Sequence, residues 1–165
     1  MRLGNSVIGL IILTLLSAQA LADLRGRVVS VTDGDTVRIL SADKTEHRVR
    51  LTGIDAPERG QAFGTASRDH LSSLIAGKAV FVESSKTDRY GRILGKIILD
   101  GRDINLEQVE SGYAWWYRYY ADEQSPTDRR LYGAAEAAAQ EARRGLWADP
   151  NPVNPYEWRR SKRGR

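Results

Sequence analysis

The sequence of 165 residues contains no cysteine and only two histidines. Without cysteine the chain has no disulfide, no thiol nucleophile and no cysteine-based zinc site. His47 and His70 are not spaced as a pair of metal ligands, and each is expected to be a structural residue. Acid–base and metal chemistry must therefore depend on carboxylate, arginine and tyrosine side chains.

The sequence also lacks an apolar run long enough to cross a membrane as a helix. Its most apolar segment, residues 7–16, is well short of the roughly 20 residues that a bilayer requires. This segment follows Arg2 and precedes small residues at alternate positions, the layout of a secretory signal peptide. We predict that residues 1–22 are removed after Ala22, with Ala20 as the second choice, and that an uncleaved anchor is the alternative. The mature protein is then expected to be secreted or periplasmic, with no stable membrane span.

Positive charge is concentrated at the C-terminal end of the chain. The formal net charge is +4, and residues 159–165 (RRSKRGR) hold five basic residues and no acid. In the rest of the chain, with Arg2 also left out, acidic residues slightly outnumber basic ones. An anion-binding site there must therefore come from a local cluster of basic residues. Because residues 148–160 contain three prolines, we expect residues 151–165 to form an irregular basic tail with weak, screened attraction for polyanions.

The remaining residues, 23–150, have the length of a single domain. Alternating apolar and polar residues predict three successive antiparallel strands between residues 24 and 54 and two more at 79–85 and 93–101. Helical spacing predicts three helices, over residues 63–77, 104–112 and 125–145. This order predicts an α+β, mainly β, fold: a five-stranded Greek-key barrel of the OB-fold type with three helices. An open α+β sheet is the alternative.

The stretch VTDGDTVRIL places Asp33 and Asp35 on either side of a glycine, just before a predicted strand. Two close carboxylates repel each other unless a turn, a cation or a basic side chain compensates. A turn in which Asp33 accepts backbone hydrogen bonds accounts for Asp33 and Gly34, but it does not account for Asp35. An EF-hand loop fails, because valine, arginine and lysine stand where it needs a ligand, a glycine and a bidentate glutamate.

A second acidic stretch, RLTGIDAPE, contains Arg50, Asp55 and Glu58. Both acidic turns follow strands of the same meander, so Asp35 and Asp55 could meet at one end of the sheet. Their hard oxygen ligands suit Ca²⁺ or Mg²⁺. The stretch DRYGR adds Arg92, and arginine can bind a phosphate through two parallel hydrogen bonds. Acids, a cation and two arginines together form a coherent constellation for cleaving a phosphodiester.

Five motifs in order give the chain a specific resemblance to a known family. DGDTV, RLTGIDAPE, DRYGR, INLEQVESGYA and AAAQEARRGLW resemble the motifs of the thermonuclease family, the staphylococcal-nuclease-like domains, across residues 25–147. The resemblance implies an OB-fold barrel with three helices. It also implies hydrolysis of DNA and RNA with Ca²⁺, leaving 3′-phosphate ends.

The resemblance further implies roles for the acidic residues. Asp35 and Asp55 would be direct Ca²⁺ ligands, beside the backbone carbonyl of Ala56. Glu58 would act on the attacking water or position it. The family often has threonine where this chain has Ala56, and little loss is expected because only the carbonyl would be needed.

The same resemblance assigns the arginines and Tyr90 to the substrate, and the aromatic run adds a second tyrosine. Arg50 and Arg92 would hold the scissile phosphate and stabilise the charge that grows on it, and Tyr90 would lie near the nucleotide. The aromatic run YAWWYRYY, residues 113–120, offers base stacking worth roughly 1–3 kcal/mol per base without sequence preference. We assign Tyr120 to substrate binding and one of the two tryptophans in this run to packing.

Three functions are thus compatible with the sequence. The first is an exported, monomeric, Ca²⁺-dependent nuclease with DNA and RNA as substrates. The second is a non-catalytic OB-fold module that binds nucleic acid, and the third is a Ca²⁺-stabilised envelope protein that binds a partner through its tail and aromatic residues. The nuclease is favoured because both metal-binding acids, Glu58 and both arginines are present.

Overall fold

The computed structural model describes residues 23–164, so the predicted signal peptide lies outside the described residues. The strands are β1 (Leu24–Asp33), β2 (Thr36–Ser41), β3 (Glu46–Leu51), β4 (Ile54–Asp55), β5 (Ala79–Thr87), β6 (Ile93–Leu99), β7 (Arg102–Asp103) and β8 (Trp115–Trp116). The α-helices are α1 (Gly64–Ile75), α2 (Ile104–Glu110), α3 (Pro126–Glu141) and α4 (Pro155–Arg163). Two 3₁₀ helices, η1 (Arg118–Glu123) and η2 (Gly145–Ala148), complete the fold.

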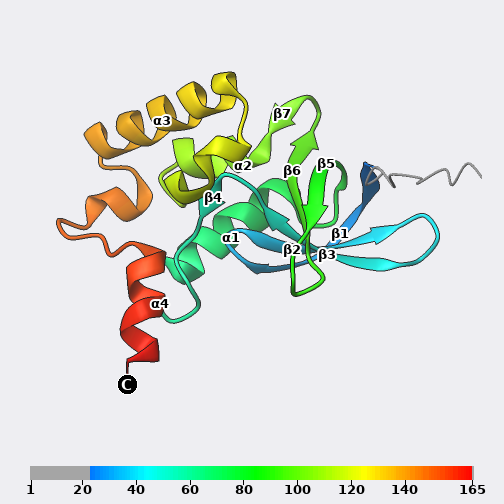
Figure 1. Ribbon diagram of the computed structural model, residues 1–165, viewed down its shortest axis with the longest axis horizontal. Helices are drawn as coiled ribbons and strands as arrows, with labels where there is room; N and C mark the ends of the chain where they lie inside the picture. The colour runs from blue at the N-terminus through cyan, green and yellow to red at the C-terminus, as the bar shows by residue number, and fades with distance from the viewer. Residues whose placement is uncertain (1–22, 165) are drawn as a thin grey trace, which may run out of the picture.

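Five of the strands close into a barrel (Figure 1). The sheet order is β3-β2-β1-β5-β6-β7, and β3 pairs in parallel with β6, with Val49 opposite Ile93 and Leu51 opposite Gly95. The other neighbouring strands of this sheet are antiparallel. This closed order with α1 inserted before β5 is the Greek-key barrel of the OB-fold, as predicted from the strand pattern.

The barrel closes because alternate strand residues are apolar and point inward. Side chains from all five barrel strands are almost completely buried, among them Val28, Val37, Ile39, Val49, Leu51, Val82 and Ile97. Leu71 and Ile75 of α1 pack into the same core. The three predicted helices are confirmed as α1, α2 and α3, and side-chain caps start α2 at Asp103 and α3 at Ser125.

The structure also contains a second, two-stranded sheet, which the alternation pattern does not predict. Strand β4 pairs with β8, so that Asp55 lies opposite Trp115 and Ile54 lies opposite Trp116. The buried carboxylate of Glu136 on α3 accepts a hydrogen bond from the Trp116 backbone N–H (3.0 Å). The acidic stretch after β3 is therefore held as a short strand rather than as a free turn.

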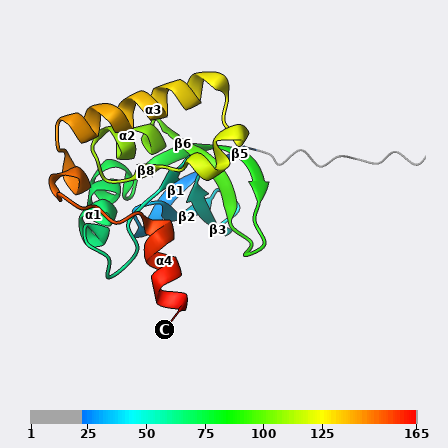
Figure 2. The ribbon, with the colours of Figure 1, turned by 60° about the vertical axis from the view of Figure 1, so that its left-hand side comes forward.

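The C-terminal segment differs from the expected irregular tail. Residues 155–163 form the helix α4, which projects from one side of the molecule (Figures 1 and 2). The Asn154 side chain caps the helix by accepting a hydrogen bond from the Tyr156 N–H (2.9 Å), and Pro155 occupies the first turn. Proline is favoured at that position, and the basic residues of the last turn complement the helix dipole. The prolines therefore start a helix here instead of preventing one.

Within residues 23–164, no helix is both long enough and apolar enough to cross a membrane.

A buried amide at the start of α2 connects this helix to the barrel. The Asn105 side chain donates hydrogen bonds to the carbonyls of Thr52 (2.9 Å) and Gly95 (3.2 Å) and accepts one from the Ile97 N–H (3.0 Å). Thr52 belongs to the connection between β3 and β4. Asn105 therefore fixes the chain that leads into the acidic stretch.

Replacing Asn105 by alanine is expected to lower the free energy of unfolding by about 2–4 kcal/mol, because buried backbone groups would lose their partners. Urea denaturation followed by circular dichroism measures this change. Asn151→Ala, at an exposed position, is the matched control and should change stability by less than about 0.5 kcal/mol. Equal effects in both variants would contradict the structural role of Asn105.

Candidate functional site

One cleft collects nearly all of the residues that the sequence singled out. It has a volume of about 730 Å³ and is lined by the β1–β2 turn, the chain around β3 and β4, the β5–β6 turn, η1 and α4. The lining includes the predicted residues Asp35, Arg50, Ala56, Glu58, Tyr90, Arg92 and Tyr120. The remaining one, Asp55, is only 1% exposed and reaches the cleft through hydrogen bonds to its arginines.

The β1–β2 turn positions Asp35. As the turn hypothesis requires, the Asp33 carboxylate accepts a hydrogen bond from the Asp35 N–H (3.1 Å). A Cβ atom at Gly34 would lie 1.8 Å from the Ser67 hydroxyl on α1, so only glycine allows this close packing. The Gln108 side chain on α2 donates to the Gly34 carbonyl (2.8 Å). Two helices thus clamp the turn that carries Asp35.

Asp35 and Asp55 converge on one guanidinium group, that of Arg50. Its Nη2 atom lies 3.0 Å from Asp35 Oδ2 and 3.1 Å from Asp55 Oδ1. Its Nη1 atom donates to the carbonyls of Leu51 (2.7 Å) and Ile54 (3.0 Å), which fixes the orientation of the side chain. The predicted meeting of the two acids is confirmed, and a basic side chain provides the compensating charge.

Burial makes both carboxylates difficult to ionise. It raises the pKa of Asp35 to about 6, although Arg50 opposes the shift. Burial also raises the pKa of Asp55, against hydrogen bonding and charge from Arg159 and Arg50. Nearly enclosed anions of this kind are stable only beside positive charge.

A second arginine, which the sequence did not suggest, contacts the same acids. Arg159 of α4 donates from Nη1 to Asp55 Oδ1 (3.0 Å) and Glu58 Oε1 (2.7 Å), and from Nη2 to Asp55 Oδ2 (2.9 Å). Burial works against its charge, but these hydrogen bonds raise the pKa of Arg159, so it remains a cation. The signal that could have found it is the Asn154-Pro155 helix start, which places the arginine on a helix rather than in a tail.

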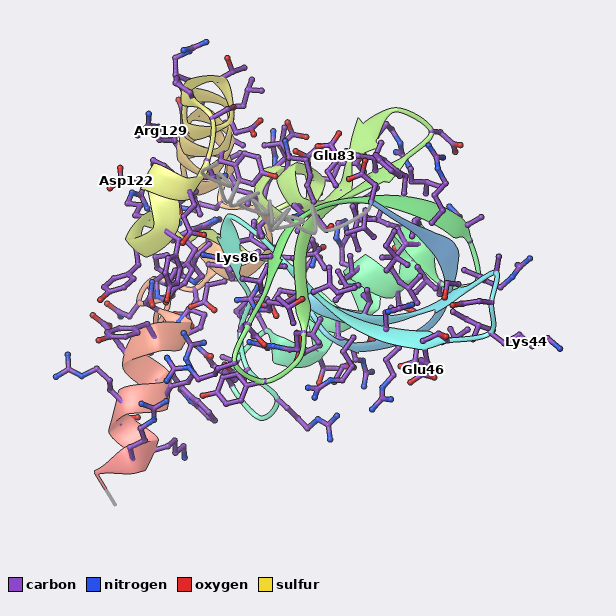
Figure 3. The ribbon with its side chains drawn as sticks, turned by 45° about the vertical axis from the view of Figure 1, so that its right-hand side comes forward. Lys44, Glu46, Glu83, Lys86, Asp122 and Arg129 are labelled. Carbon is purple, nitrogen blue, oxygen red and sulfur yellow. The ribbon has the colours of Figure 1, made fainter. Side chains whose placement is uncertain are left out.

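Arg92 lies on another part of the cleft, in the β5–β6 turn. Its Nε atom donates to Asp88 Oδ2 (2.8 Å), and Asp88 Oδ1 accepts from the N–H groups of Tyr90 and Arg92. Although burial opposes it, this hydrogen bonding lowers the pKa of Asp88. Lys86 on β5 pairs with Glu123 on η1 (2.6 Å), which holds the hairpin beside η1. In Figure 3, Lys86 lies on the α4 side of the barrel and Lys44 on the opposite side.

The aromatic run is divided between the core and the cleft. Trp115 packs against Trp147, with ring centroids 4.3 Å apart, and Trp116 packs on the main core while its indole N–H donates to Gln124 (2.8 Å). Both tryptophans are thus structural. Tyr120 is half exposed and lines the cleft.

Four tyrosines form a connected group that we call the tyrosine cluster: Tyr117, Tyr119, Tyr120 and Tyr156. Centroid separations run from 5.3 Å between Tyr117 and Tyr120 to 6.4 Å between Tyr119 and Tyr156. Tyr119 is 75% exposed. The cluster joins η1 to α4 and adds exposed aromatic surface beside the acids.

The donor set fits an oxygen-binding divalent cation. Within residues 23–164, no three histidine, cysteine, aspartate or glutamate side chains form a ready-made metal cluster. Two carboxylates, from Asp35 and Asp55, nevertheless share a positive partner, and the Ala56 N–H donates to Asp35 Oδ2 (2.8 Å). A backbone carbonyl and water could complete the oxygen coordination that Ca²⁺ accepts.

The raised pKa of Asp35 predicts a pH dependence of stability. Between about pH 4 and pH 6 the folded chain binds a proton at Asp35 more readily than the unfolded chain, so stability is lost as pH rises through about 6. In chelator, the free energy of unfolding should fall by about 1–3 kcal/mol more for the unmodified chain than for Asp35→Asn between pH 4 and pH 7. Urea denaturation across this range tests it, with the exposed Asp122→Asn as control. A smaller loss of stability in the unmodified chain than in Asp35→Asn would contradict the raised pKa of Asp35.

Comparison with known proteins identifies the family. The family model described as staphylococcal nuclease homologue matches residues 48–149, which include most of β3, the acidic stretch and the β5–β6 turn. A micrococcal nuclease from Shigella flexneri is 41% identical over 161 residues, covering 92% of this chain and 90% of its own. An uncharacterized endonuclease from Escherichia coli is 44% identical over 142 residues, covering 86% of this chain and 88% of its own. The chain therefore belongs to the staphylococcal nuclease homologue family.

Proposed function

We propose that the chain is an exported, calcium-dependent nuclease that hydrolyses phosphodiester bonds of DNA and RNA and leaves 3′-phosphate ends. The observation that carries this proposal is the convergence of Asp35 and Asp55 on Arg50, in a cleft that also presents Glu58 and Arg92. The names of its close relatives, a micrococcal nuclease and an endonuclease, support a nuclease.

The acids would hold the metal. Asp35, Asp55 and the Ala56 carbonyl are the candidate ligands, and Ca²⁺ bound there would polarise a phosphate oxygen and offset its charge. Asp35 and Asp55 are held in place before any cation binds, by the clamped β1–β2 turn and by the pairing of β4 with β8. Carboxylates held in this way need little rearrangement when a cation binds to them.

Glu58 is the candidate general base. It lies three residues after Asp55, lines the cleft and is exposed enough, at 35% of its side chain, to contact water. Its carboxylate would take the proton from the attacking water as that oxygen bonds to phosphorus. The bond from phosphorus to the 5′ oxygen then breaks, the 5′ oxygen takes a proton from solvent, and the phosphate stays on the 3′ oxygen.

The arginines and tyrosines would position the nucleic acid. Arg50 and Arg92 line the cleft and would contact phosphate oxygens, stabilising the negative charge that increases during attack. Tyr90 and Tyr120 would stack on bases. Because backbone phosphates and base faces are shared by all sequences, this arrangement favours a substrate range without base specificity.

A non-catalytic nucleic-acid-binding module is the second candidate, favoured by the exposed tyrosine cluster. Its distinguishing property is binding without cleavage. The direct experiment is incubation of the purified chain with plasmid DNA and with RNA, in Ca²⁺ and in chelator, followed by analysis of the product ends. Cleavage of both substrates only with Ca²⁺, with 3′-phosphate ends, supports the nuclease, whereas binding with no cleavage in Ca²⁺ supports the module.

Export and a monomeric state are separate parts of the proposal. Export is supported by the signal-peptide layout of residues 1–22. N-terminal sequencing of protein from the culture medium or periplasm should begin after Ala22 or Ala20, and an intact N-terminus confined to the cytoplasm would contradict export. Light scattering measures the molar mass in solution, and a mass of two or more chains would contradict the monomer.

Replacing Glu58 by glutamine should lower the cleavage rate by about 10²–10⁴-fold, because the amide keeps the shape but cannot accept the proton of water. Binding of a short oligonucleotide should persist. Turnover measured at saturating Ca²⁺, beside binding measured by fluorescence anisotropy, separates the two effects. Glu141→Gln on the exposed surface of α3 is the control and should leave the rate unchanged. A near-normal rate in Glu58→Gln would remove this residue from catalysis.

A further inference from the structure

The helix α4 lies beyond residues 48–149, which the family model matches, and yet it contributes a side chain to the acidic site. Figures 1 and 2 show α4 as a separate arm projecting from the body of the molecule. Arg159, near its middle, is 28% exposed at the side chain, whereas its partner Asp55 is 1% exposed. The arm thus brings a partly exposed cation to a buried anion.

Arg159 engages the carboxylate oxygens that a metal would need. It donates hydrogen bonds to both oxygens of Asp55, at 3.0 and 2.9 Å, and to one oxygen of Glu58, at 2.7 Å. In a paired hydrogen bond of this type, the guanidinium occupies lone pairs of both carboxylate oxygens. A divalent cation bound directly to Asp55, at about 2.3–2.6 Å, would use lone pairs of the same two oxygens. The guanidinium and the metal would therefore compete for Asp55.

We propose that Arg159 is a built-in competitor for the divalent cation: α4 holds the acidic site closed without metal, and cation binding requires Arg159 to leave Asp55. This inference rests on the proposed function, because it takes Asp35 and Asp55 as the cation site. Arg159 neutralises the acids in the metal-free protein and sets the cation concentration at which the site opens.

The contacts of α4 allow such an exchange. The chain before the helix is held separately, since the Gln61 side chain donates to the Val153 carbonyl (2.7 Å). Trp158 lines a small apolar pocket with Phe63 and Trp115. Arg159 can therefore leave Asp55 by rotating its own side chain, while these contacts keep the start of α4 in place. Arg50, by contrast, is fixed by two backbone carbonyls.

Calcium titration by calorimetry of the full mature chain tests the proposal. Arg159→Gln should bind Ca²⁺ about five- to tenfold more tightly than the unmodified chain, since the hydrogen bonds to the acids no longer have to be broken. Arg159→Lys should lie between the two, because lysine keeps the charge but loses the paired geometry. Arg160→Gln is the matched control: it removes the same charge from the next position of α4, where the side chain lies over Tyr156 instead of the acids. Its affinity should change less than twofold.

A second readout uses thermal unfolding. In chelator, Arg159→Gln should melt at a lower temperature than Arg160→Gln, because Asp55 and Glu58 lose a partner. At saturating Ca²⁺ this difference should disappear, since Arg159 has left the acids in the unmodified chain as well. A melting difference that persists in Ca²⁺, or Ca²⁺ affinity in Arg159→Gln no higher than in Arg160→Gln, overturns the proposal.

These results are distinguishable from failure of the proposed function. Calcium-dependent cleavage by the unmodified chain, together with unchanged affinity in Arg159→Gln, overturns the competition alone. Absence of Ca²⁺ binding in every variant overturns both the competition and the calcium requirement.

Discussion

The structure depends on the electrostatic cost of burying Asp35 and Asp55 next to each other. Neither carboxylate is appreciably exposed, and burial raises the pKa of both. Such a pair is stable only with positive charge between or beside its members. Arg50 supplies that charge from β3, and Arg159 supplies it from α4.

The surrounding elements hold this pair against its own repulsion. Helices α1 and α2 clamp the β1–β2 turn through Ser67 and Gln108, and the pairing of β4 with β8 fixes the strand that carries Asp55. The OB-fold barrel is thus a rigid support for a small, highly charged site. The β5–β6 hairpin and η1, joined by Lys86 and Glu123, form a more exposed wall beside it.

Much of this could be read from the sequence because the signals are local. Alternation of apolar residues located the barrel strands, and helical spacing located α1, α2 and α3. The carboxylates on either side of Gly34 and the acids of RLTGIDAPE could be matched because both follow strands of one meander. The contacts that depend on distant segments were not readable: the β4–β8 pairing joins residues 54–55 to 115–116, and Arg159 lies 104 residues from Asp55. The prolines of this segment predict an irregular tail because proline disfavours a helix interior, but Pro155 lies in the first turn of α4, where proline is favoured.

In the proposed exchange, Asp35 and Asp55 form a site at which Ca²⁺ and the Arg159 guanidinium replace each other. A crystal structure of the mature chain grown with Ca²⁺ tests it most directly. We expect one ion within about 2.3–2.6 Å of carboxylate oxygens from both residues, with Arg159 displaced from Asp55. A structure in saturating Ca²⁺ with no ion there, and with Arg159 still paired to Asp55, would contradict it.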